Sequence, residues 1–270
     1  MSHSDTKFQG SIPDVYDDYL VPLIFEDAAR DMAARVLAHS PDDVLETATG
    51  SGVVTRALAA KLPSATRYVA SDLNQPMLDR AARQQPDANS ITWRQADALD
   101  LPFEQGSFDV VCCQFGVMFF PDRIRGFREA RRVLRPGGRF LFNVWDQIAT
   151  NEFADTVTQA AGQIFPDDPP LFLARTPHGH FDTDKTCEEL DAAEFRDIEV
   201  ATFEARSTAP DPSYPAIAYC RGTPLCNEIL ERDPAGLGKV TQAATEAIRS
   251  RFGAGPVDGL VRGFVFSATA

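Results

Sequence analysis

The chain has 270 residues, of which 44% are hydrophobic and 24% charged, a composition typical of a globular protein with one large core. Its formal net charge of −13 at pH 7 disfavours nonspecific binding to phosphate backbones, so nucleic acid is not expected as a partner. No apolar run approaches the roughly 20 residues that a membrane-spanning helix needs.

The cysteines favour a reducing compartment. Their number, five, is odd, no Cys-x-x-Cys pair occurs, and Cys112 and Cys113 are adjacent within an apolar run. This pattern does not fit a disulfide framework. Residues 1–10 are polar and contain no apolar signal segment, so we expect the protein in the cytoplasm.

Residues 14–39 have apolar side chains three to four positions apart, which predicts a helix. Strands and helices then alternate along the chain. The predicted strands are 44–45, 68–72, 91–95, 108–113, 140–145, 198–203 and 260–266, and the predicted helices between and after them include 53–62, 76–84, 124–134 and 153–165. Such alternation predicts a doubly wound α/β fold with a parallel sheet.

A glycine-rich turn follows the first predicted strand, in the sequence Glu46-Thr47-Ala48-Thr49-Gly50-Ser51-Gly52. Glycine has no Cβ and tolerates positive φ, so a ligand can approach this backbone closely. The helix that follows offers unpaired N–H groups in its first turn. Taken alone, the sequence also fits a simple tight turn.

Carboxylates end the next two predicted strands. Asp72 lies 20 residues after Gly52 (72 − 52), where a carboxylate can accept both hydroxyls of a ribose or can cap the helix that starts near Pro76. Asp97, beside Ala98, can accept the amino group of an adenine or is a surface carboxylate. Because parallel strands end at one edge, all three features are expected where open α/β folds bind ligands.

These motifs resemble those of the class I S-adenosylmethionine-dependent methyltransferases, especially the branch of ubiquinone/menaquinone-biosynthesis-type enzymes. The family's glycine loop, acidic-x-Gly-x-Gly-x-Gly, matches residues 46–52. Further segments that resemble family landmarks are Ser71-Asp72-Leu73-Asn74-Gln75-Pro76-Met77-Leu78 (ribose), Asp97-Ala98-Leu99-Asp100-Leu101-Pro102-Phe103 (adenine), Phe108-Asp109-Val110-Val111 and Leu134-Arg135-Pro136-Gly137-Gly138. The resemblance covers residues 44–145.

Two positions of the loop depart from the family pattern. Ala48 replaces the first glycine, and Glu46 stands where aspartate is usual. The alanine methyl can crowd the methionine part of the cofactor, which is tolerable if the backbone there stays at negative φ. The loop also lacks the Gly-x-Gly-x-x-Gly of dinucleotide-binding proteins, because Thr55 stands three residues after Gly52.

The resemblance implies S-adenosyl-L-methionine as the cofactor and S-adenosyl-L-homocysteine as its product. The implied contacts are Glu46, Ala48, Gly50, Gly52, Asp72, Leu73, Met77, Asp97, Ala98, Gln114 and Phe115, with Leu73 and Met77 as the apolar walls of the adenine site. Tyr16 and Tyr19 are three residues apart and share a helical face. The family places such a helix over the cofactor, where a tyrosine can bond its carboxylate; ordinary packing is the alternative.

The substrate-facing candidates follow two of the strands. Phe119 and Trp145 can line an apolar acceptor pocket, although ordinary core packing is also expected of such residues. His178 and His180 are the best candidates for a general base, which methyl transfer needs only when the acceptor must lose a proton. Two histidines without a third ligand do not indicate a metal site.

The resemblance implies a seven-stranded, mostly parallel, Rossmann-like sheet with an antiparallel final strand. Residues 1–40 are expected to form a helical cover and residues 41–270 the methyltransferase domain, with substrate-side insertions near 146–190 and 207–255.

The predicted function is in-line methyl transfer from S-adenosylmethionine to a small, partly apolar metabolite. The alternatives are a nicotinamide-dependent oxidoreductase and a noncatalytic S-adenosylmethionine-binding module. The sequence leaves the acceptor atom and the oligomeric state open, a homodimer included.

Overall fold

The computed structural model describes residues 12–85 and 91–270, which form two compact units. The sheet unit consists of Glu26–Val144, Asp182–Phe203 and Phe264–Ala270. The helical unit consists of Met1–Phe25, Trp145–Phe181 and Glu204–Gly263, of which residues 1–11 lie outside the described part. The predicted division into a cover of residues 1–40 and a domain of residues 41–270 stays a prediction.

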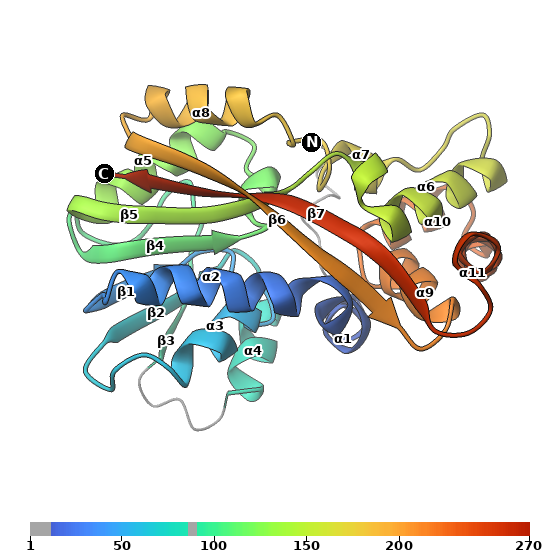
Figure 1. Cartoon of the computed structure of the whole chain (residues 1–270), viewed down its shortest axis with the longest axis horizontal. Helices are drawn as coiled ribbons and strands as arrows, with labels where there is room; N and C mark the ends of the chain where they lie inside the picture. The colour runs from blue at the N-terminus through green and yellow to red at the C-terminus, as the bar shows by residue number, and fades with distance from the viewer. Residues whose placement is uncertain (1–11, 86–90) are drawn as a thin grey trace. The chain divides into compact units, whose positions relative to one another are not determined.

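One seven-stranded sheet has the order β3-β2-β1-β4-β5-β7-β6, which confirms the predicted fold (Figure 1). The pairs β1–β2, β2–β3, β1–β4 and β4–β5 are parallel. From β1, the chain first adds β2 and β3 on one side and then β4 and β5 on the other, so the topological switch point lies between β1 and β4. The strands are β1 (Asp43–Glu46), β2 (Arg67–Asp72), β3 (Ile91–Gln95), β4 (Phe108–Gln114), β5 (Leu134–Trp145), β6 (Arg196–Ala209) and β7 (Val257–Thr269).

Strand β7 runs antiparallel to β5. The N–H of Gly137 donates to the carbonyl of Ala270 at 3.1 Å, and the N–H of Ala270 donates to Gly138 at 2.9 Å. At the other end, the N–H of Asp146 donates to the carbonyl of Arg262 at 3.0 Å. Residue numbers therefore fall on one strand as they rise on the other, as an antiparallel final strand requires.

Helices cover both faces of the sheet unit. They are α2 (Glu26–Ala38), α3 (Val53–Ala59), α4 (Gln75–Arg83), η2 (Val117–Phe119), α5 (Arg123–Val133) and α8 (Thr183–Ala192). The sequence reading missed α8, whose start is marked by Asp182: its carboxylate accepts the N–H of Lys185 at 3.0 Å. Arg123 of α5 holds α8 in place by donating from Nε to Glu189 Oε2 at 2.6 Å.

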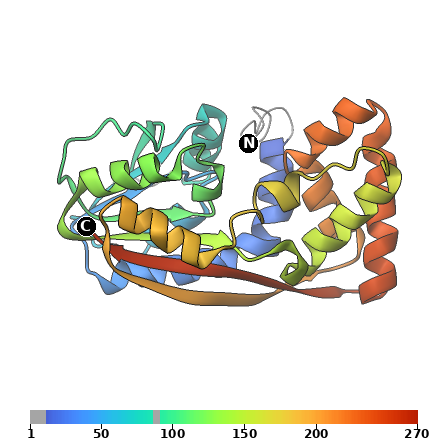
Figure 2. The ribbon, with the colours of Figure 1, turned by 90° about the horizontal axis from the view of Figure 1, so that it is seen from above.

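Alternate residues of β5 point to the two faces, as strand geometry requires. Leu141 is buried with Met32 of α2 and Leu58 of α3. Its neighbours Phe140 and Phe142 lie on the other face, with ring centroids 5.8 and 5.3 Å from Phe127 of α5. Figure 2 accordingly shows the blue helix α2 on one side of the strands and the green α5 and gold α8 on the other.

The helical unit begins with α1 (Ile12–Val15) and a π-helix, η1 (Tyr16–Phe25), which contains Pro22. The predicted helix over 14–39 is therefore present as three consecutive helical segments, of which α2 is the last. The unit also holds η3 (Ile148–Thr150), α6 (Glu152–Ile164), α7 (Phe172–Arg175), α9 (Ser213–Arg221), α10 (Leu225–Arg232) and α11 (Gly236–Phe252). Within the described ranges, no helix combines the length and apolarity of a membrane span.

The phenylalanine cluster of β5 predicts a large stability difference between two matched substitutions. Phe142 is fully buried and its ring lies 4.8 Å from that of Phe266, so Phe142→Ala should lower the free energy of unfolding by about 3–5 kcal/mol. Phe181 is 43% exposed, and Phe181→Ala should change it by less than about 0.5 kcal/mol. Equal midpoints of the two variants in urea unfolding would contradict this assignment of the core.

Candidate functional site

The strands β1, β2, β3 and β4 end together at the carboxyl edge of the sheet unit. Glu46, the last residue of β1, is in register with Ala70 and Cys112, and Asp72, the last residue of β2, pairs with Gln95. The sequence-predicted loop and the end of β2 therefore lie side by side.

The Asp72 carboxylate connects β2 to the glycine loop. Its Oδ2 accepts the N–H of Gly50 at 2.8 Å, and its Oδ1 accepts the N–H of Asn74 at 2.7 Å. Burial raises the pKa of Asp72, and the two N–H groups oppose that shift because they favour the charged form. The Asn74 side-chain amide also donates to Oδ1, at 3.4 Å, whereas Oδ2 accepts only the Gly50 N–H among the described residues and keeps a lone pair for a ligand hydroxyl.

The condition set for Ala48 is not met, because its φ is +51° and not negative. Gly50 and Gly52 of the same loop have φ values of +59° and +84°. A left-handed alanine costs roughly 1–2 kcal/mol. Its methyl is turned toward the turn after β4: a Cβ on Gly116 would lie 2.4 Å from that of Ala48, so Gly116 makes room for it.

Gly52 and Ser51 of the same loop have one structural role and, among the described residues, one free polar group. A Cβ on Gly52 would lie 2.9 Å from Ala81 Cβ in α4, so this glycine lets the loop pack against the helix that follows β2. The hydroxyl of Ser51 is buried and has no hydrogen-bond partner among the described residues. A buried polar atom without a partner fits a ligand that supplies one.

Glu46 turns away from this surface toward the core. Thr55 Oγ1 donates to its Oε2 at 2.6 Å, and the hydroxyl of Tyr68 donates to the same oxygen. Burial raises the pKa of Glu46 to about 7, against the opposing effect of these two hydrogen bonds. The carboxylate thus anchors the loop from below, and its predicted contact with the cofactor stays a prediction.

The predicted adenine side contains one unusually exposed apolar residue. Leu73 is 52% exposed, whereas Met77, one turn into α4, is buried. Asp97 is exposed, and its Oδ1 accepts the N–H of Leu99 at 2.9 Å, which leaves Oδ2 toward solvent or a ligand. Ala98, beside it, is half-buried. An exposed leucine beside a carboxylate suits one face and the amino group of a purine.

Asn143 is a residue of the site that the sequence reading missed. It is buried near the end of β5, and its Oδ1 accepts the N–H of Phe115 at 2.7 Å. This bond holds the turn after Gln114, where Phe115 has a φ of +48°. The sequence contains a signal for Asn143, because it is the one polar residue in the apolar run 140–145. Phe119 lies in η2 just beyond this turn.

In the helical unit, four rings form an aromatic row in the order Tyr16, Phe25, Trp145 and His178. The rings of Tyr16 and Phe25 stack at 5.2 Å, Phe25 lies 5.9 Å from Trp145, and Trp145 lies 6.0 Å from His178. The sequence predicted three of these residues from separate segments but not Phe25. Tyr19 lies outside the row, 4.8 Å from the ring of Tyr214.

His178 is buried and held in one tautomer. Its Nδ1 lies 2.8 Å from the carbonyl oxygen of Asp146, which can only accept, so Nδ1 carries the proton and Nε2 is the acceptor. Burial lowers the pKa of His178 to about 4, so the ring is neutral at pH 7. His180 is half-buried. In the part of the chain that the structure describes, no group of three or more His, Cys, Asp or Glu could hold a metal ion.

Comparison with known proteins matches residues 45–142 to a family described as "Methyltransferase domain". Residues 45–142 form a methyltransferase domain. The domain contains the glycine loop, Asp72, Asp97 and the turn after β4, which are the features that meet at the carboxyl edge. The match confirms the predicted resemblance to methyltransferases over this part of the chain.

Part of the chain is similar in sequence to methyltransferases whose names refer to menaquinone or ubiquinone. It is 45% identical over 114 residues to the demethylmenaquinone methyltransferase of Deinococcus radiodurans, covering 42% of this chain and 46% of the relative. It is 31% identical over 132 residues to the ubiquinone/menaquinone biosynthesis C-methyltransferase UbiE of Rickettsia felis, covering 47% of this chain and 53% of the relative. The chain thus spans about half the length of these curated relatives.

A solved structure shares the fold over the whole chain. An S-adenosylmethionine-dependent methyltransferase of Thermotoga maritima is similar with a TM-score of 0.56 and 15% identity, covering 100% of this chain and 99% of that chain. At this identity the similarity concerns the fold alone, and it includes the segments outside the methyltransferase domain.

The left-handed backbone at residue 48 predicts that Ala48→Gly stabilises the protein. Glycine removes the steric cost of positive φ, and the net gain should be about 1 kcal/mol after its greater chain entropy in the unfolded state. The matched control is Ala57→Gly inside α3, which should lower the free energy of unfolding by about 0.5–1 kcal/mol. Thermal or urea unfolding measures the free energy of unfolding of both variants. A lower value for Ala48→Gly than for the wild type would contradict backbone strain at residue 48.

The raised pKa of Glu46 predicts a pH dependence of stability. Between the unfolded value of 4.5 and the folded value of about 7, the unfolded state binds fewer protons, so the free energy of unfolding falls as pH rises. At about 1.4 kcal/mol per pH unit the fall amounts to roughly 3 kcal/mol. Glu46→Gln should remove this fall, while Glu104→Gln, at an exposed site, should keep it. If the free energy of unfolding had the same pH dependence in the wild type and both variants from pH 5 to 8, the raised pKa of Glu46 would be refuted.

Proposed function

We propose that the protein catalyses methyl transfer from S-adenosylmethionine to a small, partly apolar metabolite. The observation that carries the proposal is the position of Asp72, whose carboxylate bonds Gly50 at the carboxyl edge of the methyltransferase domain. The match over residues 45–142 favours this function over a nicotinamide-dependent oxidoreductase. A noncatalytic binding module would use the same residues and is separated from an enzyme by the activity assay below.

The cofactor, when bound, supplies a methyl carbon activated by sulfonium. Asp72 would accept the ribose hydroxyls, first at Oδ2 and, in place of the long bond from the Asn74 amide, at Oδ1, because both oxygens are already oriented by backbone N–H groups. Leu73 and Met77 would bound the adenine, and Asp97 would accept its amino group, with Ala98 alongside. Gly50 and Gly52 would let the cofactor approach the backbone, beside Ala48 and Glu46.

The remaining contacts are proposed on chemical grounds. Gln114 ends β4 and Phe115 follows it, at the strand end next to the loop, and the two would border the methionine part of the cofactor. Tyr16 and Tyr19 would bond its carboxylate. These roles carry over from the family resemblance, and the proposal rests on the strand ends and not on the tyrosines.

Phe119, Trp145, His178 and His180 are the proposed substrate contacts. The row of Trp145, Phe25 and Tyr16 offers flat apolar surface, and the Nε2 of His178 offers an acceptor for a hydroxyl. With a pKa of about 4, the imidazole of His178 is better suited to orient a hydroxyl than to remove its proton at pH 7. The segments near 146–190 and 207–255 would supply the substrate side.

The proposed acceptor class is a quinone-type ring in its reduced form. The relatives named for demethylmenaquinone and for ubiquinone/menaquinone biosynthesis support a small apolar substrate of this kind. The aromatic row of the helical unit supports it independently, because flat rings pack well on aromatic faces.

The remaining expectations concern location and partners. The five cysteines are free thiols, which supports a location in the cytoplasm. The net charge of −13 supports a small molecule over nucleic acid as the partner. The proposal holds for a monomer and for a homodimer.

Removing the Asp72 carboxylate predicts a specific loss of cofactor binding. Asp72→Ala should weaken the binding of S-adenosylhomocysteine at least about tenfold, since it removes charge-assisted bonds to the ribose and frees the Gly50 N–H. Asp79→Ala, at an exposed carboxylate of α4, should bind as the wild type does. Calorimetric titration measures both affinities.

The same two variants test catalysis. Wild type and Asp79→Ala should transfer labelled methyl groups from S-adenosylmethionine to a reduced naphthoquinone, and Asp72→Ala should not. Tight binding without transfer to any acceptor of a metabolite panel would support the noncatalytic module. Unchanged affinity in Asp72→Ala would refute the cofactor site itself.

A further inference from the structure

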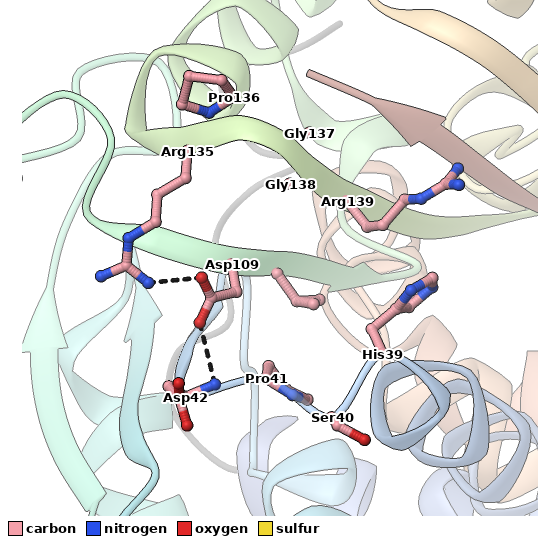
Figure 3. Close-up of a pocket in the computed structure, with 11 residues that line it drawn as sticks. His39, Ser40, Pro41, Asp42, Asp109, Arg135, Pro136, Gly137, Gly138 and Arg139 are labelled. Carbon is pink, nitrogen blue, oxygen red and sulfur yellow. Dashed lines mark hydrogen bonds and ion pairs between the residues drawn. The ribbon is translucent and has the colours of Figure 1, made fainter.

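A hollow lies in the sheet unit, at the amino edge where β1, β4 and β5 begin. Its volume is about 380 Å³, and its walls come from 39–42 before β1, from the start of β4 and from 135–139 of β5 (Figure 3). Strands β1 and β4 end at the opposite edge, at Glu46 and Gln114. The function proposed above uses none of these residues.

Ion pairs account for one end of this hollow. Arg135 donates from Nη2 to Asp43 at 2.6 Å and also bonds Asp109, and Asp109 Oδ2 accepts the N–H groups of Asp42 and Asp43 at 2.9 Å each. Figure 3 shows the Arg135–Asp109 pair and the bond from Asp42. Burial would raise the pKa of both carboxyl groups, but the bonds from Arg67 and Arg135 lower the pKa of Asp43, and the bonds from Arg135 and the two N–H groups lower that of Asp109. The charge of Arg135 is therefore neutralised within the fold.

The other end of the hollow is different. Arg139 and His39 lie there together, and the side chains of both extend on the same side in Figure 3. Neither side chain has a hydrogen bond or an ion pair with any described residue. His39 is exposed and Arg139 half-buried, so both cationic groups are open to solvent and to a ligand, whereas Arg135 is engaged within the fold.

Of the two charged side chains that act on His39, the cation Arg139 has the larger effect. Burial and, next in size, the charge of Arg139 lower the pKa of His39, while Glu199 on β6 opposes them with a smaller effect than Arg139. Asp42 also lines the hollow, on the side of the Arg135 pair, and Asp109 is engaged by Arg135.

We propose that Arg139 and His39 form a binding site for an oxyanion group, a carboxylate or a phosphate carried by a small metabolite, at the amino edge of the sheet. The planar guanidinium offers paired N–H donors that match two oxygens of either group. The imidazole adds a third donor when protonated. A bound anion stabilises the protonated imidazole, so binding tightens as the pH falls through the pKa of His39.

The test follows the imidazole C2–H signal of His39 by NMR. The chain has four histidines, and the signal lost in His39→Gln identifies the one required. Sodium sulfate and sodium acetate serve as probes in separate arms, at constant ionic strength set with chloride. The expected result is a saturating shift of the His39 signal, a higher His39 pKa in the bound state, and tighter sulfate binding at pH 5.5 than at pH 8.

Two arginine variants control for net charge. Arg139→Gln should weaken the saturating probe at least about tenfold, whereas Arg83→Gln, at an exposed residue in the last turn of α4, removes the same charge and should leave binding unchanged. Saturation by sulfate alone assigns the site to phosphate-type groups, and saturation by acetate alone assigns it to carboxylates. A His39 signal that does not saturate with either probe, or equal affinities in the two variants, overturns the proposal.

Discussion

The hydrogen bond from the Gly50 N–H to the Asp72 carboxylate is the interaction on which the carboxyl edge depends. It joins two strand ends that the parallel register has already brought together, and it orients a carboxylate before any ligand arrives. The bond forms only because the loop between β1 and α3 turns back over the end of β2, which it does through three left-handed residues, Ala48, Gly50 and Gly52. Preorganised donors and acceptors of this kind reduce the ordering that binding would otherwise require.

Strain at this edge is offset by contacts below it. Ala48 and Phe115 both have positive φ, a backbone state that costs roughly 1–3 kcal/mol for residues other than glycine. Gly116 provides space for the Ala48 methyl, and Asn143 holds Phe115 by its backbone N–H. From beneath, Glu46 binds Thr55 and Tyr68. The surface that we propose for the cofactor is therefore supported by residues that do not themselves need to touch it.

The sequence predicted the strands, and it predicted that the glycine loop, Asp72 and Asp97 follow three successive strands. It could do so because strand periodicity, glycine and Asp are local signals. It did not predict the positive φ of Ala48, since that depends on the space above Gly116, far along the chain. Nor did it predict that Glu46 points inward, because its partner Tyr68 comes from another strand. The aromatic row from Tyr16 to His178 likewise unites segments that no local pattern connects.

The central claim is that this edge binds S-adenosylmethionine and not a dinucleotide. Isothermal titration of the purified protein with S-adenosylmethionine and, separately, with NAD tests it most directly. The account predicts saturable binding of S-adenosylmethionine with one site per chain and no detectable heat of binding from NAD. Saturable binding of NAD, with none of S-adenosylmethionine, would contradict it.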